Sequence, residues 1–142
     1  MGNLDLPYRQ VHLDFHTSAA CEDVGRDFDP EEFVRTLKMG QVESITIFGK
    51  CHHGFSYYPT QVGTQHPNLS FDLMGEQLRA LHGAGIRAPI YVSIMWDDLA
   101  GEQHPEWVVV DREGRMVMRP PLTNYSPLEG KTGWTTLDVS SG

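Results

Sequence analysis

A cluster of cationic, imidazole and phenolic side chains follows directly after an apolar run in the sequence. Residues 44–48 are rich in β-branched and aromatic side chains and end at a glycine, which is typical of a buried strand. The groups that follow are Lys50, His52, His53 and Tyr57. In parallel α/β proteins, ligands bind at the carboxyl ends of the strands. The sequence therefore predicts a binding site where this strand ends.

A second group of ionisable side chains alternates along another predicted strand, residues 11–16. Its odd-numbered positions are apolar, and its even-numbered positions are His12, Asp14 and His16. Because side chains alternate along a strand, the three ionisable groups share one face, where burial without partners would be costly. Two interpretations remain open, an exposed edge strand with a polar outer face and a barrel interior or sheet crevice that holds a polar ligand.

These residue types suit the recognition of a sugar. A pyranose presents several hydroxyl groups and one apolar face, so its site needs side chains that donate and accept hydrogen bonds and an aromatic platform. The candidate substrate-binding residues are His16, Lys50, His52, His53, Trp96, Asp14 and Tyr57. Trp96 could equally be a core residue, the histidines could lie on a solvated loop, and Tyr57 could simply pack that loop.

A metal centre is the alternative chemistry. Several barrel hydrolases carry a His-x-His metal pair on the first strand, and His12, Asp14 and His16 could hold a divalent ion together with His52 or His53. The pattern here is His-x-Asp-x-His, and no further ligand stands at a clear spacing. We expect no cofactor and no metal for the sugar-binding interpretation, and a metal-dependent hydrolase remains its alternative.

Catalytic carboxylates are the missing part. Hydrolysis of a glycoside needs two carboxyl groups, about 5 Å apart for retention and further apart for inversion. The carboxylates available near the predicted site are Asp14, Asp97, Asp98 and Glu102. Asp97 and Asp98 are weak candidates, because the side chains of sequence neighbours normally diverge. We expect the acid and the nucleophile to lie beyond residue 142.

The elements between these groups alternate between strands and helices. Asp29 and Pro30 predict a helix start and Gly40 its end, and Asp72 begins a second helical pattern that continues to residue 83. Residues 86–96 form a third predicted strand. This β-α-β-α-β order predicts a parallel sheet, with strands near 11–16, 44–50 and 88–96 as neighbours in that order and helices near 30–39 and 72–83 on one face.

The last third of the chain is predicted to decorate that sheet. Residues 108–118 indicate a β-hairpin that turns at Glu113 and Gly114, and residues 134–139 indicate a short strand. The chain of 142 residues has no second-domain boundary and is expected to form a single domain, residues 1–142. Its formal net charge of −8 argues against nucleic acid and anionic membranes as partners. The absence of a signal or membrane segment predicts a cytoplasmic location.

Four segments resemble a family of glycoside hydrolase-like proteins with TIM-barrel domains that are distantly similar to α-L-fucosidases. The resemblance covers about residues 8 to 140, and its segments are residues 12–16, 48–55, 91–96 and 104–107. Fucosidases have a segment that resembles the second one: a lysine, two adjacent histidines, an acidic residue, Gly-Phe and an aromatic residue. Their imidazoles bind sugar hydroxyls. Here Cys51 follows Lys50, no acidic residue separates His53 from Gly54, and the spacing is shifted by one.

The resemblance implies a partial (β/α)8 TIM barrel, the first three to four βα units with a hairpin insertion after the third strand. It implies a substrate-binding half of a longer carbohydrate-metabolism enzyme that hydrolyses O-glycosidic bonds and could form a homo-oligomer. The 142-residue chain is then a fragment that is inactive alone. A non-catalytic binding module is the remaining alternative, because a few βα units leave barrel edges unpaired.

Overall fold

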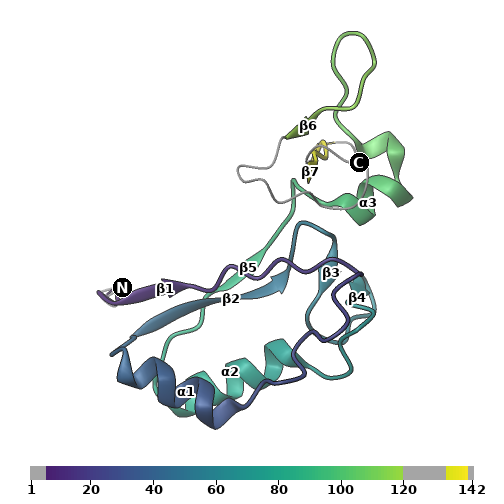
Figure 1. Ribbon diagram of the computed structural model, residues 1–142. Helices are drawn as coiled ribbons and strands as arrows, with labels where there is room; N and C mark the ends of the chain where they lie inside the picture. The colour runs from purple at the N-terminus through teal and green to yellow at the C-terminus, as the bar shows by residue number, and fades with distance from the viewer. Residues whose placement is uncertain (1–5, 120–133, 141–142) are drawn as a thin grey trace.

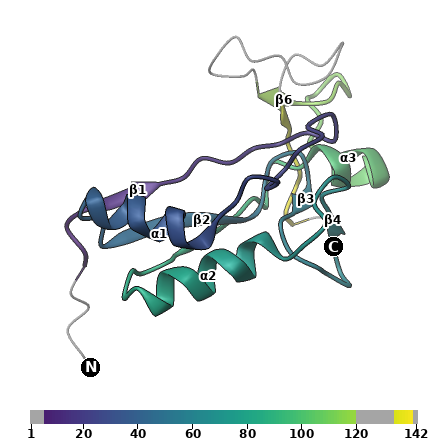
Figure 2. The same ribbon diagram turned by 60° about the horizontal axis from the view of Figure 1, so that its bottom comes forward.

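The computed structural model describes residues 6–119 and 134–140, and it is a mixed α/β structure. Three strands form its centre: β1 (Gln10–His12) and β5 (Ile90–Val92) both pair in parallel with β2 (Ser44–Lys50). The helices α1 (Pro30–Met39) and α2 (Leu73–Gly83) lie on one face of these strands (Figures 1 and 2). The predicted strand order and the shared helical face are confirmed.

Both long helices begin where the sequence predicts. The Asp29 carboxylate accepts hydrogen bonds from the backbone N–H groups of Glu31 and Glu32, and Pro30 occupies the first turn of α1. Asp72 caps α2 in the same way through the backbone N–H of Gly75. Each cap satisfies N–H groups that have no partner inside the helix.

The apolar faces of β2 and the helices enclose the core. Leu37 of α1 and Leu81 of α2 pack against Ile45 and Ile47, which are 2% and 0% exposed. A second apolar cluster lies further along β2, around Phe48, Cys51, Tyr57 and Leu73. The packed core fixes the direction of β2 and therefore the place where its carboxyl end delivers Lys50.

The outer strands are shorter than the sequence predicts. Strand β1 ends at His12, although the backbone N–H of Leu13 still donates to the Thr46 carbonyl at 3.0 Å. Residues 86–96 give only Ile90–Val92 as a strand, because Pro89 has no N–H for the ladder and the chain leaves β2 after Ser93. The alternation predicted for residues 11–16 is nevertheless present, since Leu13 packs on the helix-side core and His12 lies against Phe48.

Several small elements fold over the carboxyl ends of the central strands. The loop after β2 forms β3 (Phe55–Ser56), antiparallel to β2, and β4 (Thr64–Gln65), parallel to β3. The chain after β5 forms α3 (Asp98–Gln103) and the 3-10 turn Pro105–Trp107. The sequence did not predict these elements.

The predicted hairpin and the last predicted strand are both present. Val110 pairs with Met116, and the turn between them uses Gly114 at a φ of 78°. Beyond it, β6 (Met118–Arg119) pairs antiparallel with β7 (Trp134–Thr135), and Thr136 forms an antiparallel bridge with Trp96. The end of the chain thereby returns to the segment that follows β5.

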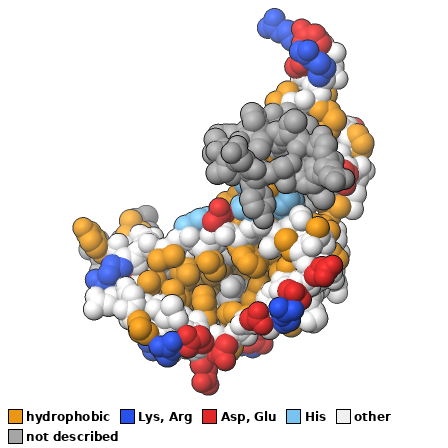
Figure 3. Space-filling model, viewed as in Figure 1, with side chains coloured by type: hydrophobic (Ala, Val, Ile, Leu, Met, Phe, Trp, Pro, Cys, Tyr) orange, Lys and Arg blue, Asp and Glu red, His pale blue; other side chains and the backbone are white. Residues whose placement is uncertain are grey.

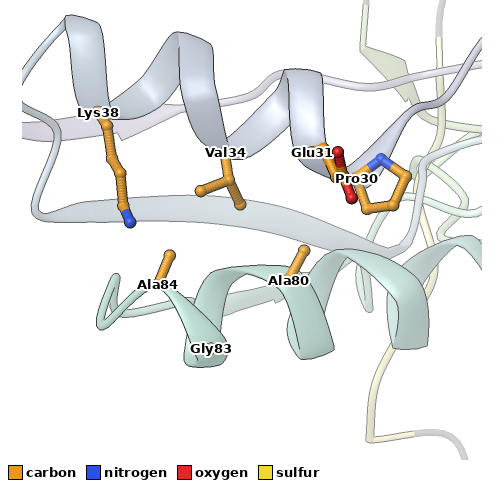
Figure 4. Close-up of a pocket in the computed structure, with 7 residues that line it drawn as sticks. All are labelled: Pro30, Glu31, Val34, Lys38, Ala80, Gly83 and Ala84. Carbon is orange, nitrogen blue, oxygen red and sulfur yellow. The ribbon is translucent and has the colours of Figure 1, made fainter.

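Two grooves accompany α1. The groove between α1 and α2, about 270 Å³ in volume, is lined mainly by Val34, Ala80 and Ala84, with Lys38 and Glu31 at its two ends (Figure 4). A second groove of about 360 Å³ lies between β1 and α1 and is mostly apolar (Figure 3). Neither contains a predicted site residue. No helix in residues 6–119 and 134–140 has the length and apolar character needed to cross a membrane.

Candidate functional site

The candidate site is a group of imidazole and aromatic rings where β1, β2 and β5 end. The His16 and His52 rings stack with centroids 4.1 Å apart, and Trp96 meets His52 edge to face at 4.9 Å. His16 also lies against Phe48 at 5.0 Å. Figure 3 shows the histidine side chains gathered beside an acidic side chain, above the apolar face of the molecule. Segments that lie far apart in the sequence thus bring the predicted residues together.

The proton of His16 is placed by its two neighbours. The backbone N–H of His52 donates to His16 Nδ1 at 3.2 Å, so Nδ1 carries a lone pair. The proton of the neutral ring is then on Nε2, which lies 3.0 Å from Asp14 Oδ1. Burial lowers the pKa of His16 below its ordinary value, although Asp14 acts in the opposite direction. His16 is therefore a neutral ring oriented by a carboxylate.

The proton of His52 is placed by Ser93. The Ser93 hydroxyl donates to the Trp96 carbonyl, so its oxygen is an acceptor for His52 Nδ1–H, at 2.6 Å. His52 Nε2 then keeps its lone pair and is a hydrogen-bond acceptor. Burial lowers the pKa of His52 to about 4, and the nearby His16 ring adds to the effect. The ring is 7% exposed.

Below about pH 6.5 the chain is expected to lose stability. The pKa of His52 is about 4 in the fold against 6.5 for an ordinary histidine, and burial lowers those of His16 and His66 as well. Between these pH values the histidines are protonated in the unfolded chain but remain neutral in the folded chain. The free energy of unfolding therefore decreases as the pH falls. Urea unfolding across this range and NMR titration of His52 measure the effect, and a His52 midpoint near 6.5 would contradict the structure.

Lys50 is held by a partner that the sequence did not identify. Its ammonium group forms an ion pair with Asp97, whose side chain is 2% exposed. The other Asp97 oxygen caps α3 by accepting from the backbone N–H of Ala100 at 2.8 Å. Lys50 therefore ties the end of β2 to α3, and an ammonium group has further N–H donors for a ligand.

Asp97 and Asp98 have separate partners. Asp97 binds Lys50 and Ala100, whereas Asp98 Oδ1 accepts from the backbone N–H of Thr135 at 2.9 Å. Both carboxylates are buried, at 2% and 3% exposure. They hold α3 against β2 and β7, a positioning role that differs from an acid and nucleophile acting on one bond.

Tyr57 packs the loop, which is the alternative that the sequence left open for this candidate substrate-binding residue. The side chain is 1% exposed and belongs to the apolar core. Its hydroxyl donates to the Phe15 carbonyl at 2.9 Å and accepts from the backbone N–H of Thr17 at 3.1 Å. Burial raises the pKa of Tyr57 above its ordinary value. The hydroxyl anchors the segment after β1 to the loop after β2, which is why the ring is buried.

The geometry gives the metal alternative no support. His12 Nε2 and His16 Nε2 lie 4.0 Å and 3.0 Å from the same oxygen of Asp14. Within residues 6–119 and 134–140, however, no group of three or more His, Cys, Asp or Glu side chains is arranged to hold a metal ion. Asp14 is exposed and acts here as a hydrogen-bond acceptor for His16.

Trp134 is a site residue that the sequence reasoning missed. Its ring meets three histidines, with centroid distances of 4.7 Å to His53, 5.1 Å to His52 and 5.9 Å to His16. It comes from β7, more than eighty residues after the histidine pair. The predicted strand over 134–139 was the available signal, but nothing in its pattern places it on this site.

Two comparisons with known proteins gave matches. A family model described as hypothetical glycosyl hydrolase 6 matches residues 29–139. Among solved structures, α-L-fucosidase isoenzyme 2 from Paenibacillus thiaminolyticus is similar, with a TM-score of 0.81 and 41% sequence identity. The match covers 93% of this chain and 19% of that one, so the chain spans about a fifth of the fucosidase. No curated protein matches.

Proposed function

The chain belongs to the hypothetical glycosyl hydrolase 6 family, and from this premise we propose that it is the sugar-binding part of a glycoside hydrolase. The observation that carries the proposal is the stacked pair of His16 and His52 where β1 and β2 end, with the protons of both rings placed by neighbouring groups. His52 Nε2 keeps a lone pair in this arrangement, and a neutral imidazole accepts a hydrogen bond from a sugar hydroxyl without needing a metal ion.

The proposed architecture is the first part of a (β/α)8 barrel. Parallel strands in sequential order with helices on one face are the arrangement that opens such a barrel. The apolar groove between β1 and α1, and the half-exposed Ile90 and Val92 of β5, support further strands and helices on both sides in a longer protein. Ligands bind at the carboxyl ends of barrel strands, which is where the histidines lie.

The proposed substrate is a glycoside whose terminal ring is held by hydroxyl and apolar contacts. His52 Nε2 would accept from one hydroxyl, Lys50 would donate to another, and Trp96 and Trp134 offer aromatic surface for the apolar face of the ring. The similar solved structure is named an α-L-fucosidase, so L-fucose is the first sugar to test.

The catalytic acid and nucleophile are proposed to come from a longer polypeptide. Asp97 binds Lys50 and one oxygen of Asp98 binds the Thr135 backbone, and both side chains are buried, which leaves them poorly suited to attack a sugar or protonate a leaving group. Both would then be positioning residues. A non-catalytic binding module would also give an isolated chain without hydrolytic activity. The two functions can therefore be distinguished only in the longer protein.

Hydrolysis of aryl glycosides tests the proposal. The 142-residue chain is expected to give no turnover, and a longer polypeptide that contains it is expected to hydrolyse at least one α-glycoside of the panel. In the longer protein, His52→Ala should lower kcat/KM by about 100-fold, roughly 3 kcal/mol, because hydrogen bonds to sugar hydroxyls strengthen in the transition state.

The exposed His82 of α2 provides the matched control, and His82→Ala should leave kcat/KM unchanged. Turnover by the short chain that disappears in Asp97→Asn or Asp98→Asn would contradict the placement of the catalytic groups. Absence of hydrolysis by the longer protein, with sugar binding intact, would favour the binding module.

A further inference from the structure

One oxygen of Asp98 has no hydrogen-bond partner among the residues that the structure describes. Its Oδ1 accepts from the Thr135 backbone N–H, whereas Oδ2 is buried and unpaired. The residue is 3% exposed, and its own backbone N–H donates to the His52 carbonyl at 2.9 Å. The backbone and one carboxylate oxygen of Asp98 are therefore held by hydrogen bonds, while the other carboxylate oxygen is buried away from water.

An unpaired buried carboxylate oxygen is costly. Leaving a buried charged group without a partner costs several kcal/mol, so a hydrogen-bond donor is expected within reach. His53 Nδ1 lies 3.9 Å from Asp98 Oδ2, about 1 Å longer than a hydrogen bond. The His53 side chain is 6% exposed, so water competes little for this nitrogen.

The packing around the pair prevents Asp98 from turning to another donor. Gly101 lies one turn further along α3, and a Cβ there would meet Thr135 Cγ2 at 2.5 Å. Gly54 follows His53 directly and is similarly crowded by Leu99. The helix, β7 and the histidine loop are thus in close contact at these two glycines, and a cavity of about 120 Å³ lined by His53 and Asp98 leaves room for the His53 ring to rotate and close the distance.

We infer that Asp98 is a positioning residue that accepts a hydrogen bond from Nδ1–H of His53 and so leaves Nε2 of His53 as the acceptor nitrogen. Ser93 already does this for His52, which donates from Nδ1 to the serine oxygen. The two adjacent histidines then have the same tautomer, each set by a different residue from the segment after β5.

The consequence for recognition rests on the proposed function. A fixed tautomer sets which nitrogen of an imidazole accepts a hydrogen bond, and an acceptor nitrogen favours a free hydroxyl over a position that is methylated or replaced by hydrogen. This preference does not depend on the catalytic groups.

Long-range ¹H–¹⁵N NMR of the histidine rings in the 142-residue chain tests the inference without any sugar. In the unaltered chain at neutral pH, His53 is expected to carry its proton on Nδ1, with Nε2 unprotonated. Asp98→Asn places an amide NH₂ against Nδ1 when the amide oxygen keeps the Thr135 contact, so His53 is expected to change to the Nε2–H tautomer. His52 should keep the Nδ1–H tautomer in both proteins.

Asp111→Asn is the matched control, because Asp111 is a carboxylate of the distant hairpin that binds Arg115. It should change neither histidine. A His53 ring protonated on Nε2 alone in the unaltered chain would overturn the inference, and this result needs no variant to fold. The proposed function is tested separately, because addition of a sugar can perturb His52 whichever tautomer His53 adopts.

Discussion

Gly54→Ala is expected to destabilise the chain by about 3 kcal/mol or more, because backbone strain and a steric clash act together at this position. Gly54 has a φ of 92°, a conformation that costs an alanine roughly 1–2 kcal/mol. The new Cβ would also overlap Asp97 Oδ1 and lie 2.5 Å from Leu99 Cβ. Asp97 is held by Lys50 and Ala100, so it cannot yield, and overpacking of this kind costs about 1–3 kcal/mol more.

Gly114→Ala separates the two causes. Gly114 has a φ of 78°, but a Cβ there would meet nothing within 4 Å. Its substitution should therefore cost roughly 1–2 kcal/mol, the backbone effect alone. Urea unfolding of both variants, with the histidine resonances recorded in parallel, makes the comparison. Equal costs at the two positions would show that the contact between the histidine loop and α3 is not as close as described.

Lys50→Met is expected to cost about 3 kcal/mol, because it leaves the Asp97 carboxylate buried without its cation. The lysine stem is largely preserved by methionine, so the loss is mainly electrostatic. The same change should loosen α3, whose first turn depends on Asp97, and it should therefore disturb the rings of His52 and Trp134.

A double-mutant cycle with Asp97→Asn identifies the ion pair as the cause. Asparagine can still cap α3 but carries no charge, so the double variant should recover about half of the loss or more. Lys38→Met is the control, since Lys38 is exposed at the end of α1 and should change the unfolding free energy by less than about 0.5 kcal/mol. Strictly additive effects at positions 50 and 97 would mean that the pair contributes nothing.

Local patterns in the sequence were sufficient for the framework. Asp29 and Pro30 mark the start of α1, Asp72 marks α2, and the apolar run before Gly49 is the buried strand β2. These elements are specified by caps and by hydrophobic periodicity, both of which act over a few residues. The parallel order follows because sequential strands joined by helices have few alternatives.

The arrangement within the site depends on contacts that no local pattern contains. In the sequence, Tyr57 is a polar ring close to the histidines. In the fold, its hydroxyl donates a hydrogen bond to the carbonyl of Phe15, more than forty residues away, and the ring is buried in the core. Lys50 forms an ion pair with Asp97, and the histidine rings contact the ring of Trp134. Both partners come from the part of the chain after β5. Sequence spacing predicts which groups gather at a strand end, whereas their partners are set by the tertiary fold.

The most direct test of sugar recognition by the histidine cluster is titration of the folded chain with a panel of monosaccharides, L-fucose first, followed through the imidazole nitrogens of His52. The account predicts a saturable shift of His52 and His16 with at least one sugar, and no saturable shift in Ser93→Ala, whose His52 proton is no longer fixed. Concentrations up to about 100 mM detect even the weak binding expected of a partial site, ~1–2 kcal/mol in free energy. An unperturbed His52 with every sugar of the panel would contradict the account.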